Sequence, residues 1–281
     1  MRNAALLVAS LLLVPVVLAG CGGGDAIALD PVAEAATKTR DVDSMRISMT
    51  GTMTLPDAPG EVVRFSATGA ADNRAGRSSL RMTMSPLSGM PELGEFEAVM
   101  DGLVMYMRMP FLEDEKPWLK FDLRSAGRDL GIDLESLLEL GRQNDPLQTL
   151  DYLRAAGSVE ELGREKVRGV DTTHYRSEID YARYADLVEH ENPEAARAIR
   201  ALLEQTGGAL VVPMEIWIDE EGLVRRQALE LELAIPSGAG SAPTRMTQTM
   251  EFYDFDAPVD IRVPPPDEVA NPDELTEAET G

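Results

Sequence analysis

Apolar and polar residues alternate with a period of two in several stretches of this chain, and this alternation restricts the fold more than any other feature. In residues 44–54, Met, Ile and Gly occupy every second position, and Arg, Ser and Thr lie between them. The same alternation returns in residues 77–85, 211–219 and 223–235. A period of two is typical of an antiparallel strand with one buried face. We therefore expect a large antiparallel sheet that has one apolar face.

Short turns and a few helices divide these strands. Asp101-Gly102 lies between apolar runs and predicts a hairpin. Helical spacing of apolar residues indicates one helix over 30–43, two over 134–156 and one over 181–206, which Asn192-Pro193 breaks in two. Because a meander of strands surrounds a helical middle section, the predicted fold class is α+β.

Residues 1–20 have the organisation of a signal peptide. The apolar run from Ala4 to Leu18 is 15 residues long, which is too short for a comfortable membrane span and suits a signal-peptide core. The run ends in Leu-Ala-Gly followed by Cys21, the only cysteine in the chain. This sequence resembles the lipobox of bacterial lipoproteins, and the resemblance implies cleavage before Cys21 and a diacylglyceryl group on its sulfur. The alternative is an ordinary secretory signal followed by an incidental cysteine.

The rest of the chain divides into three parts. Residues 21–29 form a Gly-rich tether, residues 30–257 form the α+β domain, and residues 258–281 form a Pro-rich and then acidic tail that we expect to be disordered. No later stretch reaches 18 apolar residues. Because two acyl chains suffice to hold a protein at a bilayer, we expect an anchor through Cys21 to the outer face of the cytoplasmic membrane, within the cell envelope.

Composition excludes several classes of function. The 49 acidic residues outnumber the 26 basic ones, and the net charge of -23 argues against binding to nucleic acid and against a polybasic membrane contact. Two histidines and one cysteine leave no Cys/His zinc site and no disulfide within the chain. The sequence contains no nucleophile-elbow, phosphate-loop, dinucleotide or zinc-protease motif. We therefore expect a monomer with no enzyme activity, no cofactor and no metal site.

Methionine is unusually frequent, with 14 residues against six phenylalanines, and it concentrates in the predicted strands. Its flexible, polarizable side chain suits surfaces that accept variable apolar shapes, such as acyl chains of mixed length. The same residues could instead fill a closed core against the helices, and the sequence leaves both interpretations open. The candidate ligand-binding residues, which would line an apolar cavity, are Met49, Met53, Leu80, Met82, Met84, Met105, Met107, Leu119, Phe121, Met214, Ile216 and Leu231.

Three stretches, residues 117–122, 162–175 and 212–219, resemble the LolA-like lipoproteins of actinobacteria. The LppX, LprA, LprF and LprG group of lipid-carrier lipoproteins belongs to this family. The resemblance implies a half-barrel in which a curved antiparallel sheet wraps a few helices and an apolar cavity holds acyl chains. The implied function is binding or carriage of an acylated lipid by a membrane-anchored envelope lipoprotein. The rival is a non-enzymatic scaffold or sensor with the same fold and a filled core.

Overall fold

The computed structural model describes eight stretches of the chain. Four predicted features lie outside the described residues: the signal peptide, Cys21, the tether and the two helices expected over 134–156. The described residues are 31–55, 58–86, 94–109, 117–125, 157–190, 193–205, 210–233 and 244–270.

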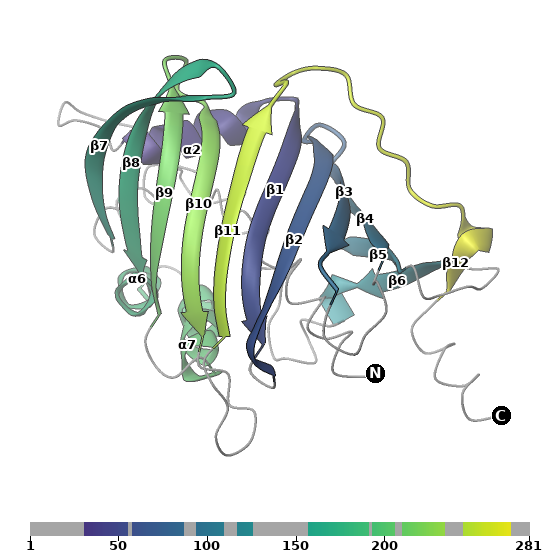
Figure 1. The fold of residues 1–281 in the computed structure, drawn as a ribbon. Helices are drawn as coiled ribbons and strands as arrows, with labels where there is room; N and C mark the ends of the chain where they lie inside the picture. The colour runs from purple at the N-terminus through teal and green to yellow at the C-terminus, as the bar shows by residue number, and fades with distance from the viewer. Residues whose placement is uncertain are drawn as a thin grey trace.

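Twelve strands of the described chain form one unclosed sheet in the order β12-β6-β5-β4-β3-β2-β1-β11-β10-β9-β8-β7 (Figure 1). Neighbouring strands are antiparallel, except that β12 is parallel to β6. Together with the helices, this sheet confirms the α+β class. The strands are β1 (Ser44–Leu55), β2 (Ala58–Asp72), β3 (Arg77–Met84), β4 (Glu95–Asp101), β5 (Val104–Arg108), β6 (Trp118–Asp122), β7 (Gly157–Val167), β8 (Val170–Asp180), β9 (Val211–Asp219), β10 (Val224–Leu233), β11 (Thr244–Tyr253) and β12 (Val269–Ala270).

The helices of the described chain are short. They are α2 (Pro31–Asp41), α6 (Tyr181–Val188), α7 (Pro193–Gln205) and a 3-10 helix, η1 (Pro266–Glu268). The break predicted within the helix over 181–206 is confirmed, since α7 begins at a proline whose missing N–H is not needed in the first turn. The carboxylate of Asp180 caps α6 by accepting hydrogen bonds from the amides of Ala182 (3.0 Å) and Arg183 (3.1 Å). Within the described stretches, no helix has the length and apolarity needed to cross a bilayer.

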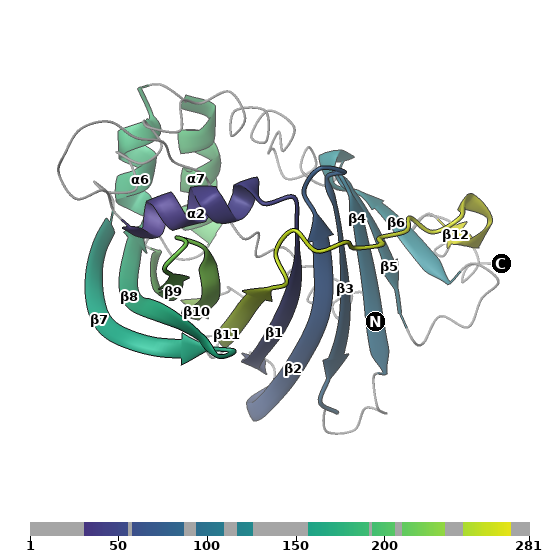
Figure 2. The same ribbon diagram turned by 90° about the horizontal axis from the view of Figure 1, so that it is seen from above.

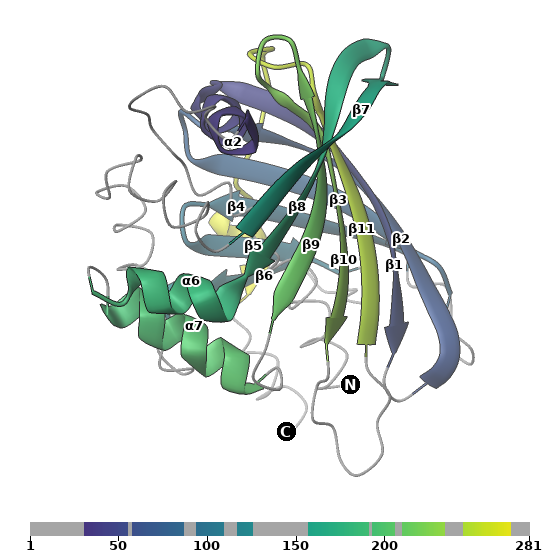
Figure 3. The same ribbon diagram turned by 90° about the vertical axis from the view of Figure 1, so that its left-hand side faces the viewer.

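The sheet is strongly curved, and α2 lies across the inside of the curve (Figure 2). Figure 3 shows α6 and α7 lying side by side near one end of the strands. One buried cluster contains Ala35 of α2, Val42 directly after that helix, and Met45, Ile216 and Phe252 of the sheet. The predicted fold, a curved antiparallel sheet that wraps helices, is therefore confirmed. The helix α2 packs against the concave face of the sheet.

The alternation predicted for the first strand is present in β1. Met45 and Met49 are buried, whereas Thr50, which points to the other face, is exposed. The hairpin predicted at Asp101-Gly102 joins β4 to β5. Gly102 has a φ of 58°, in the left-handed region that glycine adopts without a steric penalty. Local sequence therefore accounts for both the strand and its turn.

The structure corrects the predicted start of the disordered tail. Residues 258–270 cross from the end of β11 to the far edge of the sheet, where β12 lies beside β6 (Figure 1). Val269 pairs with Trp118 and Ala270 pairs with Leu119, and Ala270 is only 5% exposed. Consecutive prolines restrict the backbone before this pairing. The acidic composition of the tail predicted disorder, but Val269 and Ala270 within it form a short strand that pairs with β6.

Candidate functional site

Strand register places all twelve candidate residues on one face of the sheet. Met49 lies opposite Met250 of β11 and also opposite Ala67 of β2. Ala67 in turn lies opposite Met82, and Met82 lies opposite Phe96. Because directly opposed residues in a ladder point to the same face, each such series of partners forms a row across the strands. We refer to five such rows, defined in the next paragraph, as the apolar face.

From β8 to β12, through the middle of the sheet, none of the residues in the five rows is charged. Beyond them, Glu161 of the edge strand β7 lies opposite Tyr175. That the residues of the rows bind a ligand stays a prediction. The rows are Leu231, Met246, Met53 and Val63; Met214, Leu229, Gln248, Gly51, Phe65 and Met84; Tyr175, Ile216, Gln227, Met250, Met49, Ala67, Met82 and Phe96; Phe252, Ile47, Gly69, Leu80, Ala98, Met107, Leu119 and Ala270; and Met45, Ala71, Ser78, Met100, Met105 and Phe121.

The opposite, convex face of the same strands is polar. The hydroxyl oxygens of Thr52 and Thr247 lie 2.7 Å apart, and those of Ser66 and Thr83 lie 3.0 Å apart. Hydroxyl side chains between strands satisfy one another and remain compatible with water. The two faces therefore have opposite character, and the sheet exposes its polar side.

Trp217 is a large apolar residue on the convex face, yet it is only 6% exposed. The ring of His174 stacks on it with centroids 4.1 Å apart, and Arg226 lies over it at 5.2 Å. The ring nitrogens of His174 lie 3.3 Å from the carboxylate of Glu165 and 3.2 Å from that of Glu215. Long polar side chains thus cover the indole.

In the described residues, no group of three or more His, Cys, Asp or Glu side chains could hold a metal ion.

Ten of the twelve candidate residues lie in, or pack against, two buried clusters. The second cluster, beneath α2, contains Ile216, with Met214 packed against it. Met250 packs against both clusters and links them, whereas Met53 and Leu231 belong to neither. The first cluster, on the β1–β6 side, brings together Met49, Met82, Met105, Met107 and Leu119, with Leu80, Met84 and Phe121 packed against them.

Burial differs between the centre and the margin of the apolar face. Met82 and Met107 are each 1% exposed. A side chain beside a water-sized void would keep accessible surface, so these two residues pack directly against other protein atoms. Met84, Phe121 and Leu231 are only half-buried. The face therefore has a filled centre and an accessible margin.

A pocket of about 250 Å³ lies beside α2, between the helix and the ends of β8 and β9. Its lining includes the charged side chains of Glu34, Lys38, Asp219 and Glu220, and none of the twelve candidates. Sites for drug-sized ligands occupy roughly 300–1,000 Å³ and are mostly apolar. This pocket is therefore not the apolar cavity that the sequence predicted.

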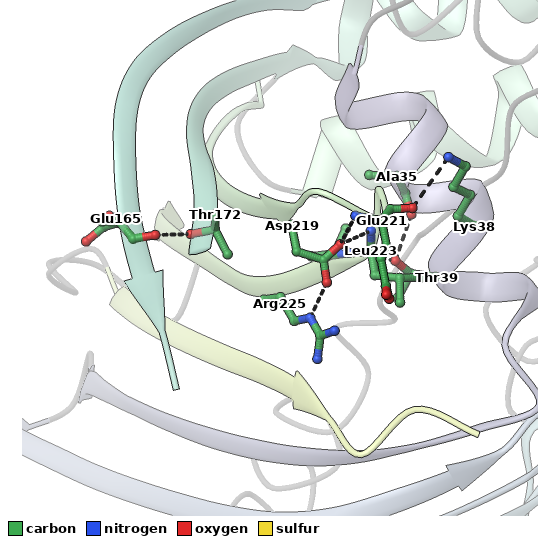
Figure 4. Close-up of polar contacts among 10 residues, drawn as sticks. Ala35, Lys38, Thr39, Glu165, Thr172, Asp219, Glu221, Leu223 and Arg225 are labelled. Atoms are coloured by element: carbon green, nitrogen blue, oxygen red, sulfur yellow. Dashed lines mark hydrogen bonds and ion pairs between the residues drawn. The ribbon is translucent and has the colours of Figure 1, made fainter. Parts of the chain in front are cut away.

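The wall of this pocket is held by saturated polar contacts (Figure 4). The carboxylate of Asp219 accepts hydrogen bonds from the amides of Glu221 (3.0 Å) and Leu223 (2.9 Å) and from Nε of Arg225 (2.5 Å). The hydroxyl of Thr39 donates to the carbonyl of Ala35 (2.7 Å). The same hydroxyl accepts from the amide of the first residue of β10 (2.8 Å). These contacts fix the β9–β10 turn and fasten α2 to it.

Four members of the apolar face that were not among the sequence candidates bear on its chemistry. Phe65 and Phe96 are buried in the first cluster, and alternation within their strands could have identified both. Gln227 and Gln248 are also buried on this face. The sequence alone does not predict their burial, because a glutamine is normally expected to face solvent. Only the strand register places these two side chains on the apolar face.

These features define a class: a curved, unclosed antiparallel sheet with helices against an uncharged concave face. No family model matches the sequence. An uncharacterised 31.2 kDa protein of Streptomyces griseus is 27% identical over 111 residues, which cover 39% of this chain and 35% of that protein. The match therefore spans about a third of the relative's length.

Solved structures similar to this chain include two mycobacterial lipoproteins. LppX of Mycobacterium tuberculosis is 14% identical with a TM-score of 0.47, and the match covers 83% of this chain and 97% of that chain. LprF from Mycobacterium bovis is 15% identical with a TM-score of 0.42, and the match covers 86% and 99%. A LolA superfamily protein from Nitrosomonas europaea is 11% identical with a TM-score of 0.25, over 85% and 96%. All three structures are under 25% identical to this chain with TM-scores below 0.5, and the resemblance to the group of LppX and LprF stays a prediction from the sequence.

Proposed function

We propose that this protein binds or carries an acylated lipid on its apolar face. The observation that carries the proposal is the continuity of that face: five registered rows without a charged residue, on the concave side of an unclosed sheet. Each methylene removed from water contributes about 0.8 kcal/mol, so an acyl chain laid along the rows would be bound without any directional contact. Methionines in the rows adapt to chains of different length and curvature.

The proposal includes the place of action. A lipid-modified Cys21 would hold the protein at the outer face of the cytoplasmic membrane, and residues 21–29 would let the domain stand off from the bilayer. The apolar face would then receive lipid and release it by changes in packing, and no bond would be made or broken. The role is accordingly non-enzymatic.

Extraction of bound lipid tests the proposal. The full chain carrying Cys21→Ser would be expressed in its native host and purified, and organic extracts would be analysed by mass spectrometry. Two neighbouring substitutions on β3 form a matched pair, because Met84 points to the apolar face and Thr83 points to the exposed face. We expect co-purified lipid in the parent and in Thr83→Asp, and its loss in Met84→Asp. Absence of acyl lipid from the parent protein would refute the function.

A second candidate function is supported by the burial of Met82 and Met107, which are each 1% exposed. A face that is filled by its own side chains could serve a scaffold or sensor lipoprotein of the envelope. The two functions differ in whether the centre of the apolar face can open, and the extraction experiment separates them.

A further inference from the structure

Two glutamines interrupt the apolar face on the neighbouring strands β10 and β11. Gln227 of β10 lies opposite Ile216 and Met250, and Gln248 of β11 lies opposite Leu229. They are 8% and 5% exposed. Because Gln248 stands two residues before Met250 on the same face of the same strand, the two glutamines are diagonal neighbours, with Cβ atoms roughly 7–8 Å apart or less. They therefore form one pair of amides within an apolar surround.

The hydrogen bonds of this pair are largely unmade. A glutamine amide offers two N–H donors and a carbonyl with two lone pairs. Nε2 of Gln248 donates to the thioether sulfur of Met49 at 2.9 Å, and a thioether is a weak acceptor. Among the residues that the structure describes, the side chain of Gln227 has no hydrogen-bond partner, and neither has the carbonyl oxygen of Gln248. The unpaired amide atoms of the two glutamines are not among the fully buried polar atoms that lack a partner, so they keep some contact with solvent and can bond to water or to a ligand.

Other buried polar side chains differ from this pair. Thr39 bonds the backbone on both sides, Thr172 donates to the carbonyl of Glu165 at 2.7 Å, and Asp219 accepts three hydrogen bonds. Each of these contacts ties two parts of the backbone together, so it has a structural explanation. The two glutamines tie nothing together in this way. Leucine or methionine would fill the same positions without leaving an amide unpaired.

The position of the pair indicates what could bind there. Met250, which lies beside both glutamines, is also the side chain that links the two buried clusters. From Gln227 the row continues through Met250, Met49 and Ala67 toward the methionine-rich side of the sheet. None of the rows contributes a charged side chain, so a carboxylate or phosphate placed here would have no counter-charge and would lose its hydration. A neutral group that both accepts and donates hydrogen bonds suits two amides.

We propose that Gln227 and Gln248 bind the ester, amide or hydroxyl groups of an uncharged acyl lipid, whose chain then extends along the methionine rows. The inference rests on the proposed lipid-binding function and specifies the class of lipid. The amides of the glutamines donate to the carbonyl at the head of the chain, and their carbonyl oxygens accept from a hydroxyl or amide N–H. Fatty-acid anions and phospholipid phosphates are disfavoured at this position.

Binding of dioleoylglycerol, oleate and octadecane to the delipidated full chain carrying Cys21→Ser tests the inference. Gln227→Met and Gln248→Met preserve side-chain length and remove the amide. Thr249→Ser, on the opposite, convex face of β11 between Gln248 and Met250, is the matched control. We expect each glutamine variant to weaken dioleoylglycerol binding by about 5- to 100-fold, to leave octadecane binding unchanged, and to melt at the same temperature as the parent or higher. The control should change binding by less than about 2-fold.

The infrared stretch of a ¹³C-labelled ester carbonyl gives a readout that does not depend on affinity. The stretch should lie at lower frequency in the parent complex than in either glutamine variant, because a hydrogen bond weakens the C=O bond. If the parent binds dioleoylglycerol and both variants bind it equally well, the glutamine inference is overturned while lipid binding stands. Tighter binding of oleate than of dioleoylglycerol by the parent would also overturn it. If the parent binds none of the three compounds, the proposed function fails and the inference fails with it.

Discussion

At the scale of single residues, burial decides what the methionines do. Met82 is 1% exposed, and Met84, two positions along the same strand, is half-buried. Met82→Trp must therefore add volume where none is free, and we expect the free energy of unfolding of the lipid-free protein to fall by about 1–3 kcal/mol. Met84→Trp, at the margin of the face, should cost less. Chemical denaturation of both variants measures the difference, and an unchanged stability for Met82→Trp would show that the centre of the face has room.

A second residue-scale prediction concerns acid stability and Glu251 on the convex face. Its carboxylate accepts hydrogen bonds from Arg226 (2.8 Å) and Arg168 (2.8 Å). Partial burial raises the pKa of Glu251, but the two guanidinium groups outweigh it, and the net pKa lies below the ordinary value of 4.5. A depressed folded-state pKa adds stability above the unfolded-state pKa, and that stability is lost as pH falls through the folded-state value.

We therefore expect Glu251→Gln to lower the melting temperature near neutral pH and to flatten its decline between about pH 5 and pH 3. Melting curves across that range, beside those of Glu220→Gln in the exposed β9–β10 turn, measure the effect. A decline in Glu251→Gln as steep as in the parent would contradict the assignment. The effect should also shrink at high salt, because the group is partly open to solvent.

At the scale of elements, the segment after β11 acts as a strap that joins the middle of the sheet to its β6 edge. Ala270 is 5% exposed and packs in the first cluster with Leu119. Ala270→Asp would bury an unpaired carboxylate, so we expect β12 to detach from β6 and the amides of Trp118 and Leu119 to exchange hydrogen faster. Hydrogen exchange measured by mass spectrometry detects this, with the exposed Glu268→Ala as control. Unchanged protection of β6 would show that β12 does not hold that edge.

The same element shows where sequence reasoning stops. Alternation and turn chemistry predict β1, the β4–β5 hairpin and the break before Pro193, because each signal lies within a few residues of the structure it determines. The pairing of Val269 with Trp118 joins distant segments through two residues, which is too short for any periodicity. For the candidate face, the period of two predicts which side chains share a side. The packing of Met82 and the unpaired amide of Gln227 depend on partners in other strands, and only the register reveals them.

At the scale of the whole molecule, an acidic exterior encloses an uncharged concave face. The net charge is -23, and its sign keeps the protein from adhering to an anionic bilayer. For the proposed place of action at a membrane, lipidation of Cys21 would supply the attachment that this acidic composition does not favour.

Cys21→Ser is the test of that attachment. Without the thiol, no thioether to a lipid can form, and we expect the protein to move from the membrane fraction to the soluble or secreted fraction. Fractionation should be carried out at low and at high salt, because salt screens any residual ionic contact with the bilayer. Gly23→Ala, in the predicted tether, is the matched control and should remain with the membrane. Retention of Cys21→Ser on membranes at high salt would refute the anchor and would leave the apolar face as the part of the molecule that contacts lipid.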